Sequence, residues 1–174
     1  VAILYEDDAS RFIAGGQLLD RPKSANCVAA GQLAVSMYGK PKQMMSDHGT
    51  QFTSLPREGC LEPDLNEFQQ WLQNDEIDHV KSRVKHPQSN GKVEKAGGII
   101  RQLVNCFGTI ERALFYYNFK RPHWSLNIEI CETPFMAFIR KMRPEQRMDF
   151  VRAHRVLVAR HAPEYIDLDE EIVK

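Results

Sequence analysis

The order of its strand-like and helix-like segments constrains this chain most strongly. Short apolar runs at residues 1–5 and 11–16 flank a polar corner and predict two strands, or one strand with a bulge. Residues 43–45 and Ile77–Val84 predict further short strands. Between and after these runs, apolar residues recur at three- and four-residue steps, the spacing that buries one face of a helix. Strands and helices that alternate in this way predict a mixed α/β domain.

Capping residues, glycines and prolines mark where the helices begin and end. Asp64 is expected to cap one helix, with Leu65 on its buried face, and Gly39 is expected to end another. The expected helices cover Ser24–Tyr38, residues 65–72, residues 93–107, Thr109–Phe119 and Thr133–Met142. The weak point is Gly97-Gly98, because each glycine in a helix interior costs about 1 kcal/mol relative to alanine.

Composition excludes several classes of protein. With 174 residues, 43% of them apolar and 26% charged, the chain is expected to be globular with one main core. The longest apolar runs have five residues, far below the roughly 18 that cross a bilayer, so no membrane partner is expected. The four cysteines match neither a zinc nor a redox spacing, and we expect reduced thiols, mostly in the core of an intracellular protein. They are residues 27, 60, 106 and 131.

The charge is unevenly distributed although the total is neutral, with 23 basic and 23 acidic residues. His79–Val104 holds six lysines and arginines against Glu94 alone, and Arg140–Arg160 holds seven against two acids. Each block therefore carries five net positive charges. They either line a phosphate backbone or form the solvated faces of helices.

Two acids stand where regular structure is expected to stop. Asp47 follows an apolar strand and precedes Gly49, and Glu94 lies in the first turn of a helix, where the helix dipole favours negative charge. Two carboxylates that converge need a cation between them, and Mg²⁺ or Mn²⁺ suits oxygen ligands of this kind. The alternative is that Asp47 is an ordinary Asx-turn residue and Glu94 an ordinary first-turn acid.

Several strings resemble the integrase core family, which comprises the DDE transposases of insertion sequences and the retroviral integrases. They occur in the family's order along residues 1–142, which we therefore take as the catalytic core, leaving 143–174 as a C-terminal extension without an assigned role. The strings are Asp7-Asp8-Ala9-Ser10-Arg11, Ser46-Asp47-His48-Gly49-Thr50-Gln51-Phe52, His86-Pro87-Gln88-Ser89-Asn90-Gly91-Lys92-Val93-Glu94-Lys95, Tyr117-Asn118-Phe119-Lys120-Arg121-Pro122-His123-Trp124-Ser125-Leu126 and Glu132-Thr133-Pro134.

The resemblance implies a ribonuclease H-like fold, a mixed sheet flanked by helices, followed here by C-terminal helices. In that family three carboxylates hold two divalent metal ions, Mg²⁺ or Mn²⁺. Asp47 matches the second acid and Glu94 the third, so both are candidate catalytic and metal-binding residues. Four polar residues near Glu94 either contact DNA or form a solvated helix end. They are Asn90, Lys92, Lys95 and Arg101.

The first acid of the family has no match in this sequence. It lies on an opening strand, upstream of the strand at which this chain begins, so we expect the core to be incomplete at its N-terminus. Asp7 and Asp8 match a different position, and we expect them to shape the corner or to bond to the neighbouring backbone.

The resemblance implies DNA integration or transposition of a mobile element, by metal-dependent phosphodiester hydrolysis and strand transfer. The expected partners are DNA ends, target DNA and further copies of the chain, inside the cell. One alternative is a catalytically inactive relic or DNA-binding module of the same fold. Another is a nuclease that acts on RNA–DNA hybrids, which would not explain the strings at residues 117–126 and 132–134.

Overall fold

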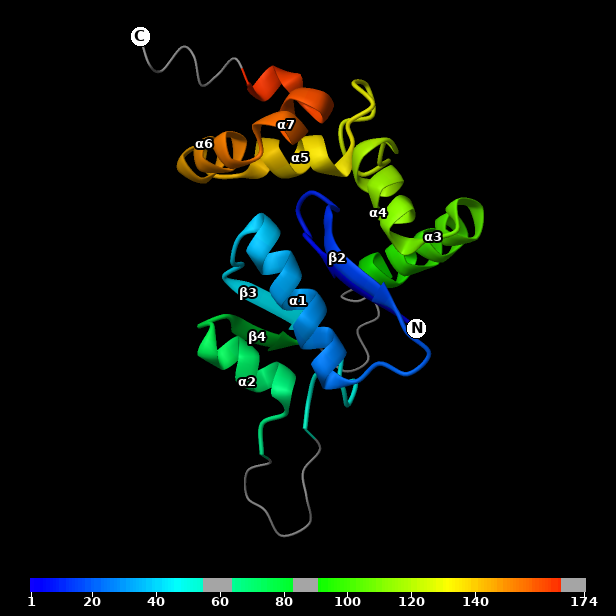
Figure 1. Ribbon diagram of the computed structural model, residues 1–174, viewed down its shortest axis with the longest axis vertical. Coiled ribbons are helices and arrows are strands. Elements are labelled where there is room, and N and C mark those ends of the chain that lie inside the picture. The colour runs from blue at the N-terminus through cyan, green and yellow to red at the C-terminus, as the bar shows by residue number, and fades with distance from the viewer. Residues whose placement is uncertain (55–63, 83–90, 167–174) are drawn as a thin grey trace. The chain divides into compact units, whose positions relative to one another are not determined.

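The computed structural model describes residues 1–54, 64–82 and 91–166 (Figure 1). The chain divides into two compact units. Unit 1 contains Val1–Tyr5 and Ala14–Gln102, and unit 2 contains Glu6–Ile13 and Leu103–Lys174. In the described ranges, no helix combines the length and the apolar character needed to cross a membrane.

The chain begins with a hairpin of two strands, β1 (Ala2–Glu6) and β2 (Ile13–Leu18), so the two-strand alternative is correct. The amide of Leu19 donates to the carbonyl of Val1, and the amide of Asp7 donates to the carbonyl of Phe12. These bonds at opposite ends of the pair make the strands antiparallel.

A parallel pair of strands forms the second sheet, which lies in unit 1. β3 (Gln43–Ser46) pairs with β4 (Asp78–Lys81), with Gln43 opposite Asp78 and Ser46 opposite Lys81. The predicted strand at residues 77–84 is shorter than expected: Ile77 precedes it as a buried core residue, and residues 83 and 84 lie outside the described ranges. The two sheets, one antiparallel and one parallel, agree with the expected mixed α/β class.

Two helices and the hairpin enclose the core of unit 1. α1 (Ser24–Tyr38) and α2 (Glu67–Asn74) pack against each other, and α2 also contacts β4 (Figure 1). The core cluster draws on β1, α1, α2 and the turn before β4. Its buried members are Ile3, Cys27, Phe68, Trp71, Leu72 and Ile77.

The start of α2 differs from the prediction. Asn66, and not Asp64, caps the helix: its side chain accepts from the amide of Gln69, whose side chain accepts from the amide of Asn66 in return. This reciprocal capping box satisfies two amide donors at the start of the helix. Asp64 lies two residues before the cap position and does not take part in it. Leu65 consequently precedes the helix and is exposed, whereas the prediction placed it in the core.

α3 (Gly91–Phe107) continues without a break through Gly97-Gly98. Ala96, Gly97 and Ile100 are buried, so packing of one face offsets the low helix propensity of the two glycines. The predicted helix is therefore confirmed, and it begins two residues earlier than expected.

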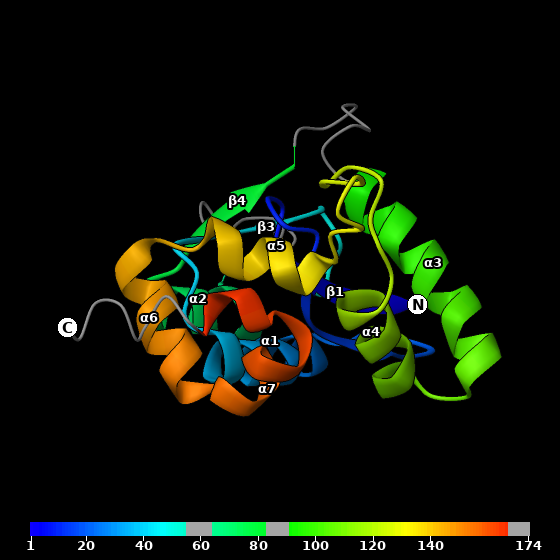
Figure 2. The same cartoon turned by 90° about the horizontal axis from the view of Figure 1, so that it is seen from above.

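Unit 2 consists mainly of short helices. They are α4 (Ile110–Phe119), α5 (Pro134–Lys141), α6 (Pro144–Ala153), α7 (Arg155–His161) and the 3-10 helix η1 (Pro163–Tyr165). Both views show α5, α6 and α7 grouped together (Figures 1 and 2). Thr109 caps α4 and Thr133 caps α5, each accepting from the amide three residues on.

Aromatic rings fill the core of unit 2. Phe12 stacks on Phe138 with ring centroids 4.6 Å apart, and Phe119 lies 4.6 Å from Phe135. The imidazole of His161 lies 4.7 Å from Phe119. Val158 of α7 is fully buried. Residues after position 142 therefore help to form this core.

Candidate functional site

Asp47 lies directly after β3, where the strand ends. Its side chain is exposed, and one carboxylate oxygen accepts from the amide of Gly49 at 2.9 Å. This is the Asx turn that the simpler alternative predicted. A carboxylate has about four lone-pair positions, so the turn leaves acceptor capacity on Asp47 for a ligand.

Two histidine hydrogen bonds connect the side chains on either side of Asp47 to β4 and to the residue that follows it. The hydroxyl of Ser46 bonds Nε2 of His79 at 2.8 Å, and Nε2 of His48 bonds the carbonyl of Ser82 at 2.7 Å. Burial, and then the charge of Lys81, lower the pKa of His79 below 6.5. These bonds connect Ser46 to β4 and His48 to Ser82. The turn that carries the Asp47 carboxylate is therefore fixed to the neighbouring strand.

Glu94 occupies the first turn of α3, as predicted, and its side chain is exposed. Lys92, Lys95 and Arg101 on the same helix are exposed as well. Arg101 follows Glu94 by seven residues, so the two share a helix face, with Gly98 between them. A Cβ atom added to Gly98 would meet no atom within 4 Å, so this face of α3 is open. Asn90 lies outside the described residues.

The metal-binding capacity of these residues follows from their donor atoms. Asp47 and Glu94 supply carboxylate oxygens from unit 1, the donors that Mg²⁺ and Mn²⁺ accept, and such an ion takes one or two protein carboxylates together with water and phosphate. Within residues 1–54, 64–82 and 91–166, no group of three or more His, Cys, Asp or Glu side chains could hold a metal ion.

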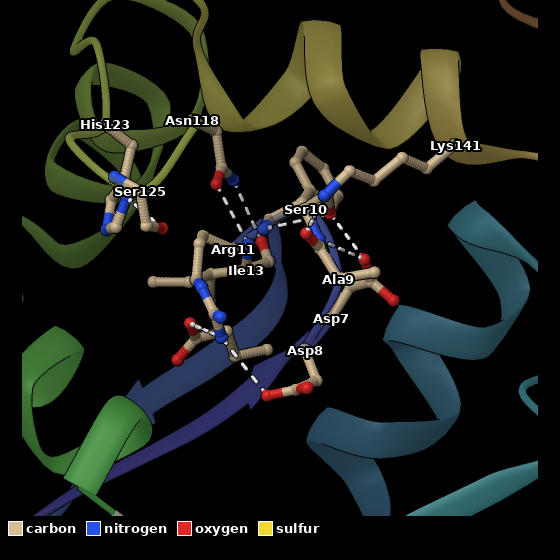
Figure 3. Close-up of polar contacts among 12 residues, drawn as sticks. Asp7, Asp8, Ala9, Ser10, Arg11, Ile13, Asn118, His123, Ser125 and Lys141 are labelled. Atoms are coloured by element: carbon tan, nitrogen blue, oxygen red, sulfur yellow. Dashed lines mark hydrogen bonds and ion pairs between the residues drawn. The ribbon is translucent and has the colours of Figure 1, made fainter. Parts of the chain in front are cut away.

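Asp7 and Asp8 shape the corner between β1 and β2, as predicted (Figure 3). One oxygen of Asp7 accepts from both the amide and the hydroxyl of Ser10, at 2.8 and 2.5 Å. Asp8 pairs with the guanidinium of Arg11 at 3.1 Å. Both acids therefore stabilise the local structure of the corner.

Asn118 has a role that the sequence-based analysis did not assign. Its side-chain oxygen accepts from the amide of Ile13 at 3.0 Å, and its side-chain amide donates to the carbonyl of Ile13 at 2.9 Å (Figure 3). Lys141 also donates to the carbonyl of Ala9. The string at residues 117–126 thus supports the β1–β2 corner. A signal was available: Asn118 is a polar residue beside the buried Tyr117 on one helix.

The cysteines only partly match their predicted place in the core. Cys27 is fully buried, and burial followed by the charge of Asp47 raises its pKa to about 11 against an opposing backbone hydrogen bond. Cys106 and Cys131 are exposed free thiols, which corrects the expectation that most cysteines fill the core. Cys60 lies outside the described ranges.

Comparison with curated proteins identifies viral relatives. No protein-family model matches the chain. A Gag-Pro-Pol polyprotein of Human T-cell leukemia virus 3 (strain 2026ND) is 31% identical over 83 residues, which are 48% of this chain and 5% of the polyprotein. A putative integrase of Spiroplasma virus SpV1-C74 is 27% identical over 147 residues, 75% of this chain and 40% of that protein. The chain thus spans less than half the length of these relatives.

Solved structures with the same fold are integrase catalytic cores. The HTLV-2 integrase catalytic core domain, solved with magnesium in a dimeric form, has a TM-score of 0.56 at 22% identity and covers 76% of this chain and 80% of that one. A simian T-cell lymphotropic virus intasome gives 0.62 at 18% identity, covering 82% and 49%. The BIV integrase catalytic core gives 0.60 at 16% identity, covering 80% and 85%.

These comparisons show the fold of the chain. The chain has the ribonuclease H-like fold of an integrase catalytic core, and the resemblance to the integrase core family that its motifs indicated is confirmed.

Proposed function

We propose that this chain is part of an enzyme that integrates DNA, by metal-dependent phosphodiester hydrolysis followed by strand transfer. One observation carries the proposal: the integrase-core fold places Asp47 immediately after β3 and Glu94 in the first turn of α3, both exposed. Exposure matters because a carboxylate whose acceptor positions are all occupied by protein partners has none left for a metal ion.

The proposed chemistry divides between the carboxylates and the nearby cations. Asp47 and Glu94 bind Mg²⁺ or Mn²⁺, with two ions in the complete site. A divalent ion held there lowers the pKa of the attacking water or hydroxyl and stabilises the leaving oxygen. Lys92, Lys95 and Arg101 project from α3 and bind backbone phosphates, and Asn90 contacts the DNA just before the helix.

The wider setting is part of the same proposal. Residues 1–142 act as the catalytic core, with 143–174 as an extension, and further copies of the chain assemble with it on DNA ends and target DNA inside the cell. The HTLV-2 core was solved in dimeric and trimeric forms, which supports assembly by an integrase of this fold.

A strand-transfer assay tests the proposal. Two forms of the protein are tested: the chain itself, and a longer form extended by the residues encoded before Val1. Each is incubated with labelled DNA ends, target DNA and Mg²⁺. We expect joined products that disappear in Asp47→Asn and Glu94→Gln and persist in Glu111→Gln. Glu111 is the matched control because it is also an exposed first-turn acid, on α4. Joining that is absent with both forms of the chain, or unchanged in Glu94→Gln, would contradict the proposal.

A second candidate function is a DNA-binding module without catalysis. It is supported by the described residues, which offer no group of three metal-ligand side chains. This function predicts DNA binding that weakens steeply with salt, without cleavage. Mg²⁺-dependent nicking by the 174-residue chain would reject it. In the same assay, cleavage of RNA–DNA hybrids in preference to DNA joining would instead favour a hybrid-specific nuclease.

A further inference from the structure

A closely hydrogen-bonded segment connects α4 to α5. We call residues 120–133 the α4–α5 loop. The amide of His123 donates to the carbonyl of Glu132 at 3.1 Å, and the amide of Glu132 donates to the carbonyl of Asn127 at 2.9 Å. Turns within the loop add bonds from Leu126 to His123 and from Cys131 to Ile128. The loop therefore has a defined shape of its own.

Glu132 holds this shape from inside. Its side chain is 1% exposed, and its two oxygens accept from Nε and a terminal nitrogen of Arg140 at 2.6 and 3.0 Å. One of these oxygens also accepts from the amide of Asn127 at 3.0 Å. The paired charges fix the base of the loop on α5, because a buried carboxylate is stable only when it is paired and hydrogen-bonded.

Three large apolar side chains of this loop are exposed. Trp124 is 81% exposed, whereas the chain's other tryptophan, Trp71, is 5% exposed in the core of unit 1. Ile128 and Ile130 are also exposed on the loop. A large aromatic side chain left in water on a well-ordered frame is typical of a contact surface, since burying it on a partner recovers the hydrophobic free energy.

Basic residues that precede Trp124 closely in the sequence favour nucleic acid as the partner. Lys120 and Arg121 begin the loop, and the Arg121 guanidinium lies over the Tyr117 ring at 5.9 Å. Glu129 is the single acid in residues 120–131 of the sequence. An aromatic ring flanked by cations is how proteins bind unpaired bases, with the ring stacked on the base and the cations on adjacent phosphates.

The apolar area argues against a second copy of the chain as the occupant. A stable protein interface needs roughly 800 Å² from each partner, and even a whole buried aromatic side chain supplies only about 150–250 Å². Trp124 with two partly exposed isoleucines falls short of that area. A single base needs no more than the face of one ring.

We propose that Trp124 stacks on an unpaired base of DNA while Lys120 and Arg121 bind the neighbouring phosphates. This inference rests on the proposed function, because it takes DNA as the substrate, and it adds a specific contact outside the Asp47 and Glu94 region. Glu132 is a positioning residue for this contact, since it acts through the loop.

Binding of fluorescein-labelled oligothymidine, followed by anisotropy, tests the contact. We expect Trp124→Ala to weaken binding roughly 5- to 150-fold, the range for losing one base–aromatic stack. Trp124→Phe keeps most of the affinity because it keeps a ring. Val156→Ala is the matched control, since Val156 is 84% exposed on α7 of the same unit, and it should bind as the unchanged chain does.

A second readout reports on the indole itself. In Trp71→Phe, Trp124 is the single tryptophan, and we expect oligothymidine to quench its fluorescence. If the chain binds DNA with equal affinity in Trp124→Ala, the stacking contact is wrong and the proposed function stands. If the chain binds no DNA at low salt, both the stacking contact and the proposed function are wrong. Self-association that Trp124→Ala abolishes would overturn the inference in favour of a protein contact.

Discussion

Four acidic residues, two in each unit, differ in what already occupies their oxygens. In unit 1, Asp47 and Glu94 are exposed, and Asp47 accepts a hydrogen bond from the amide of Gly49 in its own turn. In unit 2, Glu132 is buried against Arg140, and Asp7 holds Ser10. The comparison teaches that availability, and not residue type, separates a candidate ligand from a structural acid. Each prediction below tests one side of this contrast.

The largest expected effect is on activity. Neutralising the exposed acids, in Asp47→Asn or Glu94→Gln, should reduce strand transfer by more than about 100-fold, since even residues that merely support a metal ligand contribute 10- to 100-fold. The free energy of unfolding, measured with urea, should change by no more than about 0.5 kcal/mol, as for other surface substitutions. A large loss of stability in either variant would show that the acid supports the fold and is not simply available to a ligand.

The opposite pattern is expected for the buried acid. Glu132→Ala should lower the free energy of unfolding by about 1–3 kcal/mol, because it removes three hydrogen bonds and leaves Arg140 and the Asn127 amide without their partner. Arg140 is partly exposed and can turn to water, which keeps the cost below that of a fully buried pair. Equilibrium denaturation with urea measures the change. Unchanged stability would show that the pair does not hold the α4–α5 loop.

Two helical glycines of unit 1 provide a matched pair. A Cβ atom on Gly31 would clash with the Trp71 ring, so Gly31→Ala should destabilise the chain by about 1–3 kcal/mol through overpacking. Gly98→Ala meets open space and should stabilise it by up to about 1 kcal/mol through helix propensity. Thermal unfolding of both variants measures the difference, which should have opposite signs. A loss of stability in Gly98→Ala would mean that this face of α3 is covered.

The smallest expected effect is a pH dependence with a contribution from each unit. Burial lowers the pKa of His79 in unit 1 and of His161 in unit 2, with nearby cations adding to it. The unfolded chain therefore binds more protons, so stability is full above pH 6.5 and falls as the pH drops below it. Burial raises the pKa of Glu132, but the Arg140 hydrogen bond, the Asn127 amide and the charges of Arg140 and Lys141 together lower it below 4.5, so this group acts below pH 4.5 and does not interfere.

Urea midpoints at pH 7.5 and 5.5 measure this dependence. His161→Phe keeps an aromatic ring among Phe119 and Phe135 and should reduce the difference between the two midpoints. An equal difference in the variant would assign the dependence to other groups.

Much of the fold could be predicted because its signals are local. The apolar spacing of Ser24–Tyr38, the threonine caps of α4 and α5 and the glycine that ends α1 act within a few residues. The cap of α2 was misplaced because Asp64 and Asn66 are both good capping residues, and only the return bond from Gln69 distinguishes them. The sequence-based assignment of Asp47 and Glu94 came from ordered motifs, and their joint metal binding stays a prediction.

The amino-acid sequence by itself determined the order of strands and helices, the integrase-core resemblance and the two candidate acids. These properties depend on neighbours along the chain or on the order of motifs. The tertiary structure alone decided that Asn118 holds Ile13, that Glu132 is buried against Arg140 and that Trp124 is left in water. The physical reason is that burial and pairing depend on atoms far away in sequence, which no local pattern encodes.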